Sequence, residues 1–392
     1  MMKNIGLSAV TYKDNFGSCL QTYATQYTLE KMGYDVHIFE IKGVFKQINI
    51  KKSIYYVGRL FDPVEFKYLM ANLKSRSRKA ASLPTDDYAK EMQERKKVYD
   101  DFRNKWNHML PIANSWKELR KQASEMDAVV VGSDQLWRPS NIVGSFFTLE
   151  FVPDDIKKVS FSTSIGVPEL PNNLHKHAKK FMSRFQHISV RENTAADIVK
   201  DMCGKEAKVL CDPTMMLTAE QWMEVQDKKP FTEGKYILTY FMGDNPEHRE
   251  FAKRLREKTG YKIVALLHGA TYIPEDEEYP DEKPFNVGPS EFMNLIRNAE
   301  YICTDSFHGC VFCILNQKKF FTFRRWPDGS KFSANDRIYT LLDWTGLQDR
   351  MLNGDEDISL CITKEIDYND VLERVAAKRK EAKDYLTNAL NS

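Results

Sequence analysis

The 392-residue sequence has no apolar run long enough to span a bilayer and no strong excess of either charge. Its first residues, MMKNIGLSAVTYKDNFGS, lack a long apolar stretch followed by a small-residue cleavage site, so they are predicted to form a strand instead of a signal peptide. The net charge of +2 by itself predicts no polyanionic partner, so we expect no nucleic acid. These absences favour a cytoplasmic protein.

Cysteine is scarce, and the seven cysteines form no disulfide framework, because their number is odd and they are scattered along a long chain. Cys310 and Cys313 form a C-x-x-C, but no second ligand pair stands at a spacing typical of zinc sites. Reduced core thiols are the simpler interpretation. We therefore expect a reducing environment, no metal site and no bound cofactor.

The glycine motifs of dinucleotide and P-loop sites are missing as well. Residues 5–10 and 35–41 are predicted to be strands with a helix between them, which is the βαβ opening of a parallel sheet. The connecting turn contains neither G-x-G-x-x-G nor a Walker lysine, so a dinucleotide site is unsupported. Asn15, Gly17 and Gln21 are expected to line a cleft at the end of the first strand, with an ordinary helix start as the alternative.

The length exceeds one ordinary core, so two domains are expected. Strands and helices alternate in both halves, which predicts an α/β fold with two Rossmann-like domains facing each other across a cleft. The N-terminal domain is predicted at 1–205 and the C-terminal domain at 206–392, with a final helix at about 371–390. Pro213 cannot continue a strand ladder and marks the crossing between the domains.

Residues 42–81 interrupt this alternation and open an insertion that extends to about residue 110. This segment has ten basic and two acidic residues, a charge of +8, with aromatic residues between them. The mixture suits an anionic membrane surface, where each Lys or Arg contributes about 1 kcal/mol. Peripheral contact with the inner face of a membrane is therefore one hypothesis, and a solvated helical insertion is the other. No RNA- or DNA-binding motif accompanies the segment.

Residues 301–323 (YICTDSFHGCVFCILNQKKFFTF) are predicted to form a strand, a sharp turn, a helix and another strand. His308 lies at the turn, beside a helix N-terminus, where open α/β sheets bind ligands. A histidine there can contact an anion and move a proton near neutral pH, and a buried histidine that caps its own turn is the alternative. Arg324, Arg325 and Arg337 follow the next strand and should overhang the same cleft.

Other polar residues follow predicted strands at the same edge. Asp134 and Gln135 come directly after a buried strand, and Ser164 ends the next one. Arg191 follows a short strand and is placed to hold a carboxylate or phosphate. An ion pair of Arg191 with Glu192 or another acid is the alternative.

The chain resembles the polysaccharide pyruvyl transferases over most of its length. The resemblance rests on six motifs in this order: N-F-G-S-C-L-Q-T-Y-A at 15–24, V-G-S-D-Q-L-W at 131–137, S-F-S-T-S-I-G at 160–166, V-R-E-N at 190–193, D-P-T at 212–214 and T-D-S-F-H-G at 304–309. Each motif is weak alone, and the set in this order is fairly specific. The basic segment 42–81 lies outside the strong match. Two Rossmann-like halves across a cleft form a GT-B-like arrangement.

The resemblance implies transfer of the pyruvyl group of phosphoenolpyruvate to two hydroxyls of a sugar, in a polysaccharide or its lipid-linked precursor, which forms a cyclic ketal and releases phosphate. In this family His308 looks like the proton donor or phosphate contact, and Arg191 like a clamp for the anionic donor. Ser306 and Gly309 belong to the same donor motif. Many members carry an arginine at the position of Ser306.

Because Ser306 stands at the position of that arginine, we hypothesise that Arg324, Arg325 or Arg337 makes its contact with the donor. On the acceptor side, Asp134 is the candidate general base, and five residues are expected to contact the sugar: Asn15, Gly17, Gln21, Gln135 and Ser164. Two other readings stay open. The first is a GT-B glycosyltransferase that uses a nucleotide sugar, because a fold alone does not choose its chemistry. The second is a non-catalytic scaffold of polysaccharide assembly.

Overall fold

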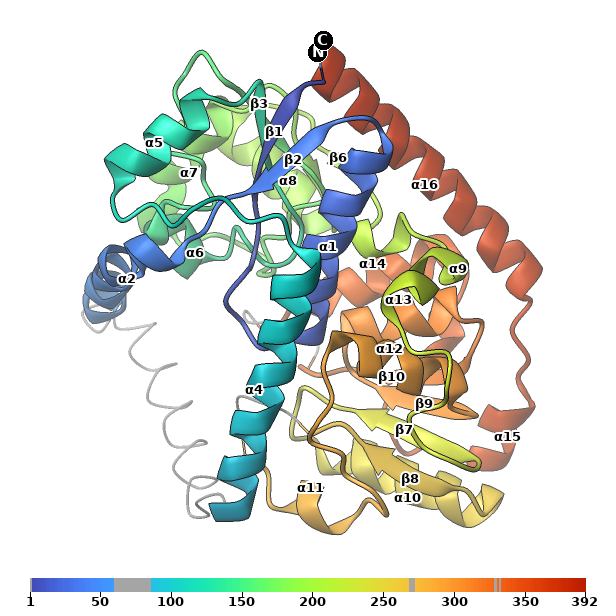
Figure 1. The fold of residues 1–392 in the computed structure, drawn as a ribbon. Coiled ribbons are helices and arrows are strands. Elements are labelled where there is room, and N and C mark those ends of the chain that lie inside the picture. Colours follow the sequence, from blue (N-terminus) through green and yellow to red (C-terminus); the bar gives the residue numbers. More distant parts are fainter. Residues whose placement is uncertain (1, 60–85, 268–271, 328–329, 331–332) are drawn as a thin grey trace.

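The computed structural model describes residues 2–59, 86–267, 272–327, 330 and 333–392 (Figure 1). The N-terminal half is built on a parallel sheet in the order β2-β1-β3-β4. Its strands are β1 (Asn4–Ser8), β2 (Asp35–Ile38), β3 (Ala128–Val131) and β4 (Lys157–Ser160). Two short parallel strands, β5 (Ser189–Val190) and β6 (Lys208–Val209), lie beside β4, since isolated bridges join Val159 to His187 and Thr163 to Val190.

The C-terminal half is built on a second parallel sheet, in the order β11-β10-β9-β7-β8. Its strands are β7 (Tyr236–Tyr240), β8 (Lys262–Ala265), β9 (Tyr301–Thr304), β10 (Lys319–Phe323) and β11 (Met351–Leu352). Strands such as β3 and β7 are buried at every position, as expected for parallel strands covered on both faces. The two sheets confirm the predicted α/β fold with two Rossmann-like halves in a GT-B-like arrangement.

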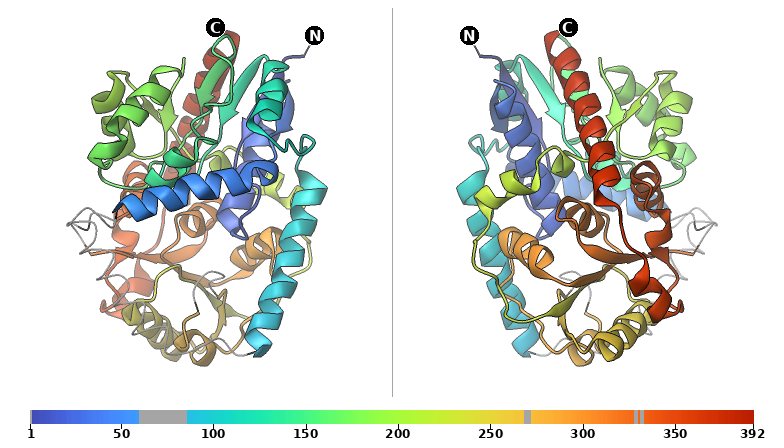
Figure 2. Two further views of the ribbon diagram at one scale, coloured as in Figure 1. Left: turned by 90° about the vertical axis from the view of Figure 1, so that its left-hand side faces the viewer. Right: turned by 90° about the vertical axis from the view of Figure 1, so that its right-hand side faces the viewer.

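Helices cover the sheets and connect their strands (Figures 1 and 2). In the N-terminal half they are α1 (Phe16–Lys31), α2 (Phe45–Arg59), α4 (Asp86–Trp106), α5 (Trp116–Ser124), α6 (Pro139–Gly144), α7 (His175–Ser183) and α8 (Asn193–Cys203). The later helices are α9 (Ala219–Trp222), α10 (Pro246–Thr259), α11 (Glu275–Glu278), α12 (Pro289–Asn298), α13 (Phe307–Leu315), α14 (Asp336–Thr345), α15 (Ile358–Thr363) and α16 (Tyr368–Asn391).

One hydrophobic core continues from the N-terminal half into the C-terminal half. Phe16, the first residue of α1, is its central contact. Its ring stacks on Phe292 of α12 at a centroid distance of 4.5 Å and on Tyr99 of α4 at 5.3 Å. Because Phe16 is almost completely buried, the first turn of α1 is held against the other half by apolar packing.

Helix α4 ties the two halves together. Its sequence belongs to the predicted insertion of the N-terminal domain, yet Arg95 donates hydrogen bonds to the carbonyl oxygens of Leu267, Pro284 and Phe285 in the C-terminal half. At its other end, Arg103 forms an ion pair with Asp14, next to the start of α1. Figure 1 shows α4 running along both halves.

The last helix, α16, crosses in the opposite direction, from the C-terminal half back to the N-terminal half (Figure 2). Tyr385 donates a hydrogen bond to the Ser160 carbonyl of β4 at 2.8 Å, and Lys3 donates to the Leu390 carbonyl at 2.7 Å. The helix predicted at about 371–390 is therefore present and extends a little further at both ends. The predicted domain boundaries themselves stay a prediction.

The basic segment is described only in part, since residues 60–85, which contain five of its ten basic residues, lie outside the described residues. The described part begins with a 3-10 helix at Lys42–Val44 and continues as α2, which lies across the N-terminal half on the side that faces the C-terminal half (Figure 2). Among the described helices, none combines the length and the apolar character that a membrane crossing requires.

We predict that Phe16→Ala lowers the free energy of unfolding by about 3–5 kcal/mol, because it removes a buried ring and leaves a cavity between the halves. Chemical denaturation measures the loss. Phe16→Leu keeps most of the volume and should cost clearly less. Equal losses for both variants, or no loss for either, would contradict a packing role for this ring.

Candidate active site

The N-termini of two helices, one from each half, meet at the centre of the molecule. A Cβ atom placed on Gly17 of α1 would lie 1.9 Å from Nδ1 of His308 in α13, so only glycine allows this approach. Helix N-termini carry partial positive charge and unpaired N–H groups, which attract anions. The approach therefore places His308 beside two such termini.

The turn before α13 has the predicted form of strand, sharp turn and helix. Ser306 is the N-cap residue, and its hydroxyl accepts a hydrogen bond from the Gly309 N–H at 3.3 Å. Gly309 is also required by packing, because an added Cβ would lie 2.5 Å from Oγ1 of Thr304. Ser306 and Gly309 thus shape the turn that presents His308.

A buried carboxylate, Asp212, faces His308 from the N-terminal half. Its Oδ2 lies 3.7 Å from Nε2 of His308 and accepts hydrogen bonds from Arg191 at 2.6 Å and from Ser133 at 2.7 Å. Its Oδ1 accepts from the backbone N–H and the hydroxyl of Thr214. Burial alone would raise the pKa of Asp212, but His308, Arg191 and these hydrogen bonds hold it well below its usual range.

Arg191 is only partly satisfied by this contact. Its guanidinium lies 4.3 Å above the ring of Phe307, and its Nη1 binds Asp212. Its Nε and Nη2 are buried and have no hydrogen-bond partner among the described residues, and the same holds for Nε2 of His308. Buried donors without partners are costly, so these atoms point to a missing ligand that accepts hydrogen bonds.

Asp134 stands beside this cluster, with its Oδ1 4.0 Å from Nη2 of Arg191. The Ser18 hydroxyl donates to its Oδ2 at 2.6 Å, and the Gln135 N–H donates to its Oδ1 at 2.8 Å. Burial would raise the pKa of Asp134, but the charges of Lys13, Arg191 and His308 outweigh it and lower the pKa to about 2. The side chain is therefore oriented and ionised at neutral pH.

The three arginines expected over the cleft differ in position. Arg337 is buried and donates to the Ala334 carbonyl, and burial together with the charge of Arg191 lowers its pKa to about 9. Arg325 binds Asp305 through both its carbonyl and its carboxylate. Arg324 instead bonds to Tyr339 and Asn353, away from His308. Arg337 therefore fits the expected position best, and Arg324 is placed elsewhere.

A pocket of about 410 Å³ opens beside Arg337 between the two halves. One wall comes from Gly166, Glu192 and Thr194 of the N-terminal half, and the other from Ser330, Ser333, Ala334, Asp336, Arg337 and Tyr339 of the C-terminal half. This volume is enough for a small phosphorylated acid together with part of a sugar ring. Of the residues expected to line the cleft, Arg337 lines this pocket, whereas His308, Arg191 and Asp134 are not among its lining residues, so the expected cleft stays a prediction.

Most of the residues predicted to contact an acceptor form hydrogen bonds within the protein or are buried. Asn15 is partly exposed and caps α1 by accepting from the Ser18 N–H, whereas Gln21 is completely buried and its side chain lines no open surface. Ser164 is also buried and donates to Glu192. Gln135 is partly exposed and remains the best placed of the set. Asn15 is the N-cap of α1, and its expected contact with an acceptor stays a prediction.

Sequence reasoning missed Ser18, Ser133 and Asp212 as members of the site. Asp212 was noted only as part of the crossing between domains, although D-P-T is one of the family-like motifs. Its position after β6, at the same edge as the other polar residues, was the available signal. Lys13 and Arg138, which act on Asp134, were missed because single cations in turns carry no pattern.

No group of three or more His, Cys, Asp or Glu side chains that could hold a metal occurs in the described part of the chain. Cys310 and Cys313 are completely buried, and burial raises the pKa of both thiols. Both cysteines lie on α13 and pack in the hydrophobic core, which agrees with their interpretation as reduced core thiols.

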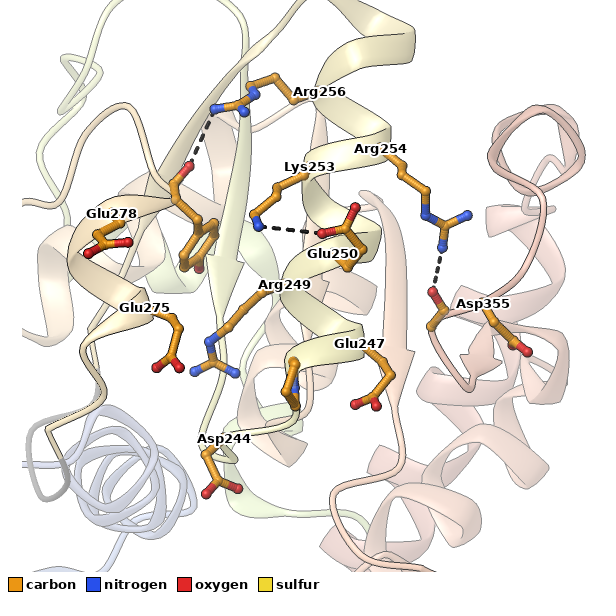
Figure 3. A pocket seen from close by; sticks show the side chains of 13 residues that line it. Asp244, Glu247, Arg249, Glu250, Lys253, Arg254, Arg256, Glu275, Glu278 and Asp355 are labelled. Atoms are coloured by element: carbon orange, nitrogen blue, oxygen red, sulfur yellow. Dashed lines mark hydrogen bonds and ion pairs between the residues drawn. The ribbon is translucent and has the colours of Figure 1, made fainter. Parts of the chain in front are cut away.

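A larger pocket of about 880 Å³ lies in the C-terminal half and is lined by residues of α10, by residues in and next to α11, and by Gly354 and Asp355 (Figure 3). Its basic side chains already have partners. Arg249 forms a buried ion pair with Asp276, Lys253 pairs with Glu250, and Arg254 donates to backbone carbonyls of residues 354 and 356. The pocket thus offers an anion no buried unpaired donor, unlike the cluster around Arg191.

Comparison with known families decides the classification. The model of the family described as polysaccharide pyruvyl transferase matches residues 15–327, most of the chain. The chain belongs to this family. Within the matched region lie Gly17, Asp134, Arg191, Asp212 and His308, the residues that meet at the centre of the molecule. No curated protein matches the sequence.

Solved structures with a similar fold include two UDP-GlcNAc 2-epimerases. The enzyme from Neisseria meningitidis, bound to UDP-GlcNAc, has 11% identity and a TM-score of 0.47, with 100% of this chain and 98% of that chain covered. The enzyme from Methanocaldococcus jannaschii has 13% identity and a TM-score of 0.45, with 96% and 92% covered. Likeness this distant carries nothing about function to this chain.

We predict that Gly17→Ala leaves the protein folded but displaces His308 and abolishes binding of anions at the cluster, because a Cβ cannot share space with the imidazole. Circular dichroism checks the fold, and calorimetry with phosphoenolpyruvate checks binding. Gly33→Ala, at a glycine just after α1, is the control, since a Cβ there meets no atom within 4 Å. Because Gly33 has a positive φ of 89°, this change should lower the stability of the fold without affecting binding. Normal binding by Gly17→Ala would contradict this contact.

Proposed function

We propose that the protein transfers the pyruvyl group of phosphoenolpyruvate to two hydroxyls of a sugar, forming a cyclic ketal and releasing phosphate. Membership of the pyruvyl transferase family supports the reaction class. The observation that carries the proposal is the cluster of His308, Arg191 and Arg337, with buried donors of His308 and Arg191 left unpaired between the two halves. Phosphoenolpyruvate bears a phosphate and a carboxylate, the groups that such donors bind.

In the proposed complex, the donor lies between the halves, held by Arg191 of the N-terminal half and by Arg337 and His308 of the C-terminal half, and the sugar lies on the N-terminal half. Nε and Nη2 of Arg191 bind one anionic group, and Arg337 binds the other. Arg337 thereby takes over the donor contact that many family members make with an arginine at the position of Ser306. A bound anion would also offset the mutual repulsion of Arg191 and Arg337, which are close enough for each charge to affect the other.

The first half of the reaction adds a sugar hydroxyl to the enol double bond. His308 gives the proton of Nε2 to the methylene carbon, which becomes a methyl group. The hydroxyl oxygen forms a bond to the neighbouring carbon, and Asp134 accepts the hydroxyl proton. Asp212 positions the imidazole of His308 for this transfer, since its Oδ2 lies 3.7 Å from Nε2.

The second half breaks the bond between that carbon and the phosphate oxygen. The phosphate leaves with the proton held by Asp134, and the second hydroxyl attacks the cation-like carbon. Its proton returns to His308, so the enzyme ends in its starting state. The ionised carboxylate of Asp134 also stabilises the positive charge that develops at the carbon.

We predict that phosphate release from phosphoenolpyruvate depends on a sugar acceptor and falls at least about 100-fold in His308→Ala, because the proton donor is lost. A panel of galactose-, mannose- and glucosamine-type acceptors with a phosphate assay provides the measurement. Lys380→Ala, an exposed change on α16, is the matched control and should keep full activity.

In the same assay, Arg337→Ala should raise the KM for phosphoenolpyruvate about tenfold or more, the effect expected when a charge-assisted contact is lost. Donor binding that is absent by calorimetry in the unmodified protein would overturn the proposed function. A nucleotide sugar that binds at micromolar strength would then favour glycosyl transfer.

We also propose that α2 makes peripheral contact with an anionic membrane. Its support is a row of exposed apolar residues, Ile50, Ile54 and Val57, spaced i, i+4 and i+7 on a helix that also carries Lys46 and Lys51. The basic residues of 60–81 lie outside the described residues. A lipid-linked acceptor would be reached from this position.

Co-sedimentation with vesicles of phosphatidylglycerol and phosphatidylcholine tests this contact. We predict binding that weakens as salt is raised and that falls several-fold in Ile54→Asp, because the change puts a carboxylate in the apolar row. Leu360→Asp alters an equally exposed leucine on α15 and is the control. Binding that is absent or insensitive to salt would rule out the contact.

A further inference from the structure

We propose that Glu192 determines which sugars the acceptor site takes, because its Oε2 accepts a hydrogen bond from a sugar hydroxyl that does not react. The sugar lies in the pocket of about 410 Å³ beside Arg337, which Glu192 lines. This inference rests on the proposed function and deepens it, since it names a specificity residue and the group that this residue recognises. That group is a hydrogen-bond donor, such as a hydroxyl, and not an ether or another group that only accepts.

The two oxygens of the Glu192 carboxyl group have unequal surroundings. Oε1 accepts hydrogen bonds from the Ser164 hydroxyl at 2.9 Å and from the N–H groups of Ile165 at 2.9 Å and Gly166 at 3.1 Å. Oε2 is buried and has no hydrogen-bond partner among the described residues. Three donors thus hold the carboxyl group in one orientation, and a donor for Oε2 is missing.

The position of Glu192 in the fold does not account for this unpaired oxygen. Glu192 is the N-cap residue of α8, but its side chain makes no capping hydrogen bond, and Asp336 of the other half accepts from the Thr194 N–H in the first turn of that helix. The sequence left open an ion pair of Arg191 with Glu192 or another acid, and the buried carboxylate that Arg191 binds is Asp212. A buried acceptor without a partner is costly, so Oε2 points to a missing ligand that donates a hydrogen bond.

The pocket has the kind of surface that a sugar ring requires. Val167 and Pro168 give it an apolar side, against which the C–H groups of a sugar can pack. Polar groups come from both halves, and the Thr194 hydroxyl donates to Asp336 at 2.7 Å, which joins the two walls. Glu192 is therefore a fixed acceptor in a pocket that combines apolar and polar walls, the usual composition of a ligand site.

The pocket adjoins residues that the proposed reaction uses. The segment that forms one of its walls begins beside Asp134, since the Ser164 N–H donates to the Asp134 carbonyl at 2.9 Å. Gly166 lies against Gln135, because a Cβ atom on Gly166 would be 2.8 Å from Nε2 of Gln135. Arg337, the proposed donor contact, lines the opposite wall. A sugar in this pocket therefore lies next to both the proposed base and the proposed donor site.

Glu192 binds the sugar and takes no part in the proton transfers. In the proposed reaction Asp134 and His308 accept the protons of the two reacting hydroxyls, so Oε2 is left for a third hydroxyl. Burial raises the pKa of Glu192, while the charges of Arg191 and Arg337 and the hydrogen bonds to Oε1 oppose this effect. A hydroxyl that donates to Oε2 stabilises the charged form further. A site with such a buried acceptor rejects analogues that lack the donor, because the acceptor is then left unpaired.

Glu192→Gln tests the contact while it keeps the shape of the side chain. Because the three groups at Oε1 are all donors, the amide oxygen must take that position, and the amide nitrogen replaces Oε2. The acceptor in the pocket thereby becomes a donor. With methyl glycosides of galactose, mannose and N-acetylglucosamine as acceptors, we expect the KM of the preferred glycoside to rise about tenfold or more. The KM for phosphoenolpyruvate should not rise, because the change removes negative charge near two arginines of the donor site.

Asp197→Asn is the matched control. Asp197 is an exposed carboxylate on the same helix, α8, and it is not among the residues that line the pocket. This variant should leave both KM values unchanged.

A series of monodeoxyfluoro sugars separates a direct contact from a structural effect. Fluorine takes up about as much space as a hydroxyl but cannot donate a hydrogen bond. The analogue with fluorine at the recognised position should raise the KM of the unmodified protein about tenfold or more. With Glu192→Gln the same analogue should cause little further loss, because the contact is already absent.

Three results would overturn the inference: an unchanged acceptor KM in Glu192→Gln, equal losses in Glu192→Gln and Asp197→Asn, or additive losses for the variant and every fluorinated sugar. Failure of phosphoenolpyruvate to bind is a different result, which contradicts the proposed function alone. Binding of the same glycosides is then measured without the donor by saturation-transfer NMR. Binding that Glu192→Gln weakens supports the contact, whereas unchanged binding, or no binding to the unmodified protein, contradicts it.

Discussion

Asp212 follows strand β6 at the edge of the N-terminal sheet, and its carboxylate is fully buried. The arrangement of the site depends on the groups that compensate this buried charge. Arg191, Ser133 and Thr214 hydrogen-bond to it from its own half, and His308 faces it from the other. Burying a carboxylate without such partners would cost several kcal/mol. The contact with Asp212 therefore fixes the direction of Arg191, whose Nε and Nη2 are left without a hydrogen-bond partner among the described residues.

The contact between the halves completes this arrangement. Apolar stacking of Phe16 on Phe292 sets the distance between α1 and α12, and the missing side chain of Gly17 lets His308 lie directly on α1. The site thus needs tight packing in one turn and unpaired polar groups in the next. Only the packed part makes the unpaired part tolerable, because it prevents the halves from shifting to satisfy those groups locally.

Much of this could be read from the sequence, for reasons that differ by residue. The strand, turn and helix around His308 have strong local signals, namely the apolar strand, the capping Ser306 and the apolar helix, so their structure was predictable. The bridging role of α4 was not, because Arg95 binds carbonyls almost 200 positions away in the chain. Gln21 and Arg324 both follow predicted strands, so the sequence placed them at the cleft. In the structure Gln21 is completely buried and Arg324 donates a hydrogen bond to Tyr339, because tertiary packing decides where such side chains point.

Two long helices each belong to one half by sequence and pack on the other half. Helix α4 follows the first strands of the N-terminal half and binds the C-terminal half, and α16 ends the C-terminal half and binds the N-terminal sheet. Exchange of one half between relatives would therefore separate each of these helices from the half on which it packs. A chimera joined near residue 206 would bring a foreign α16 to the native β4 and leave the native Arg95 facing foreign carbonyls. New acceptor preferences must instead arise by substitution or by exchange of short surface segments, which leave both helices with their original partners.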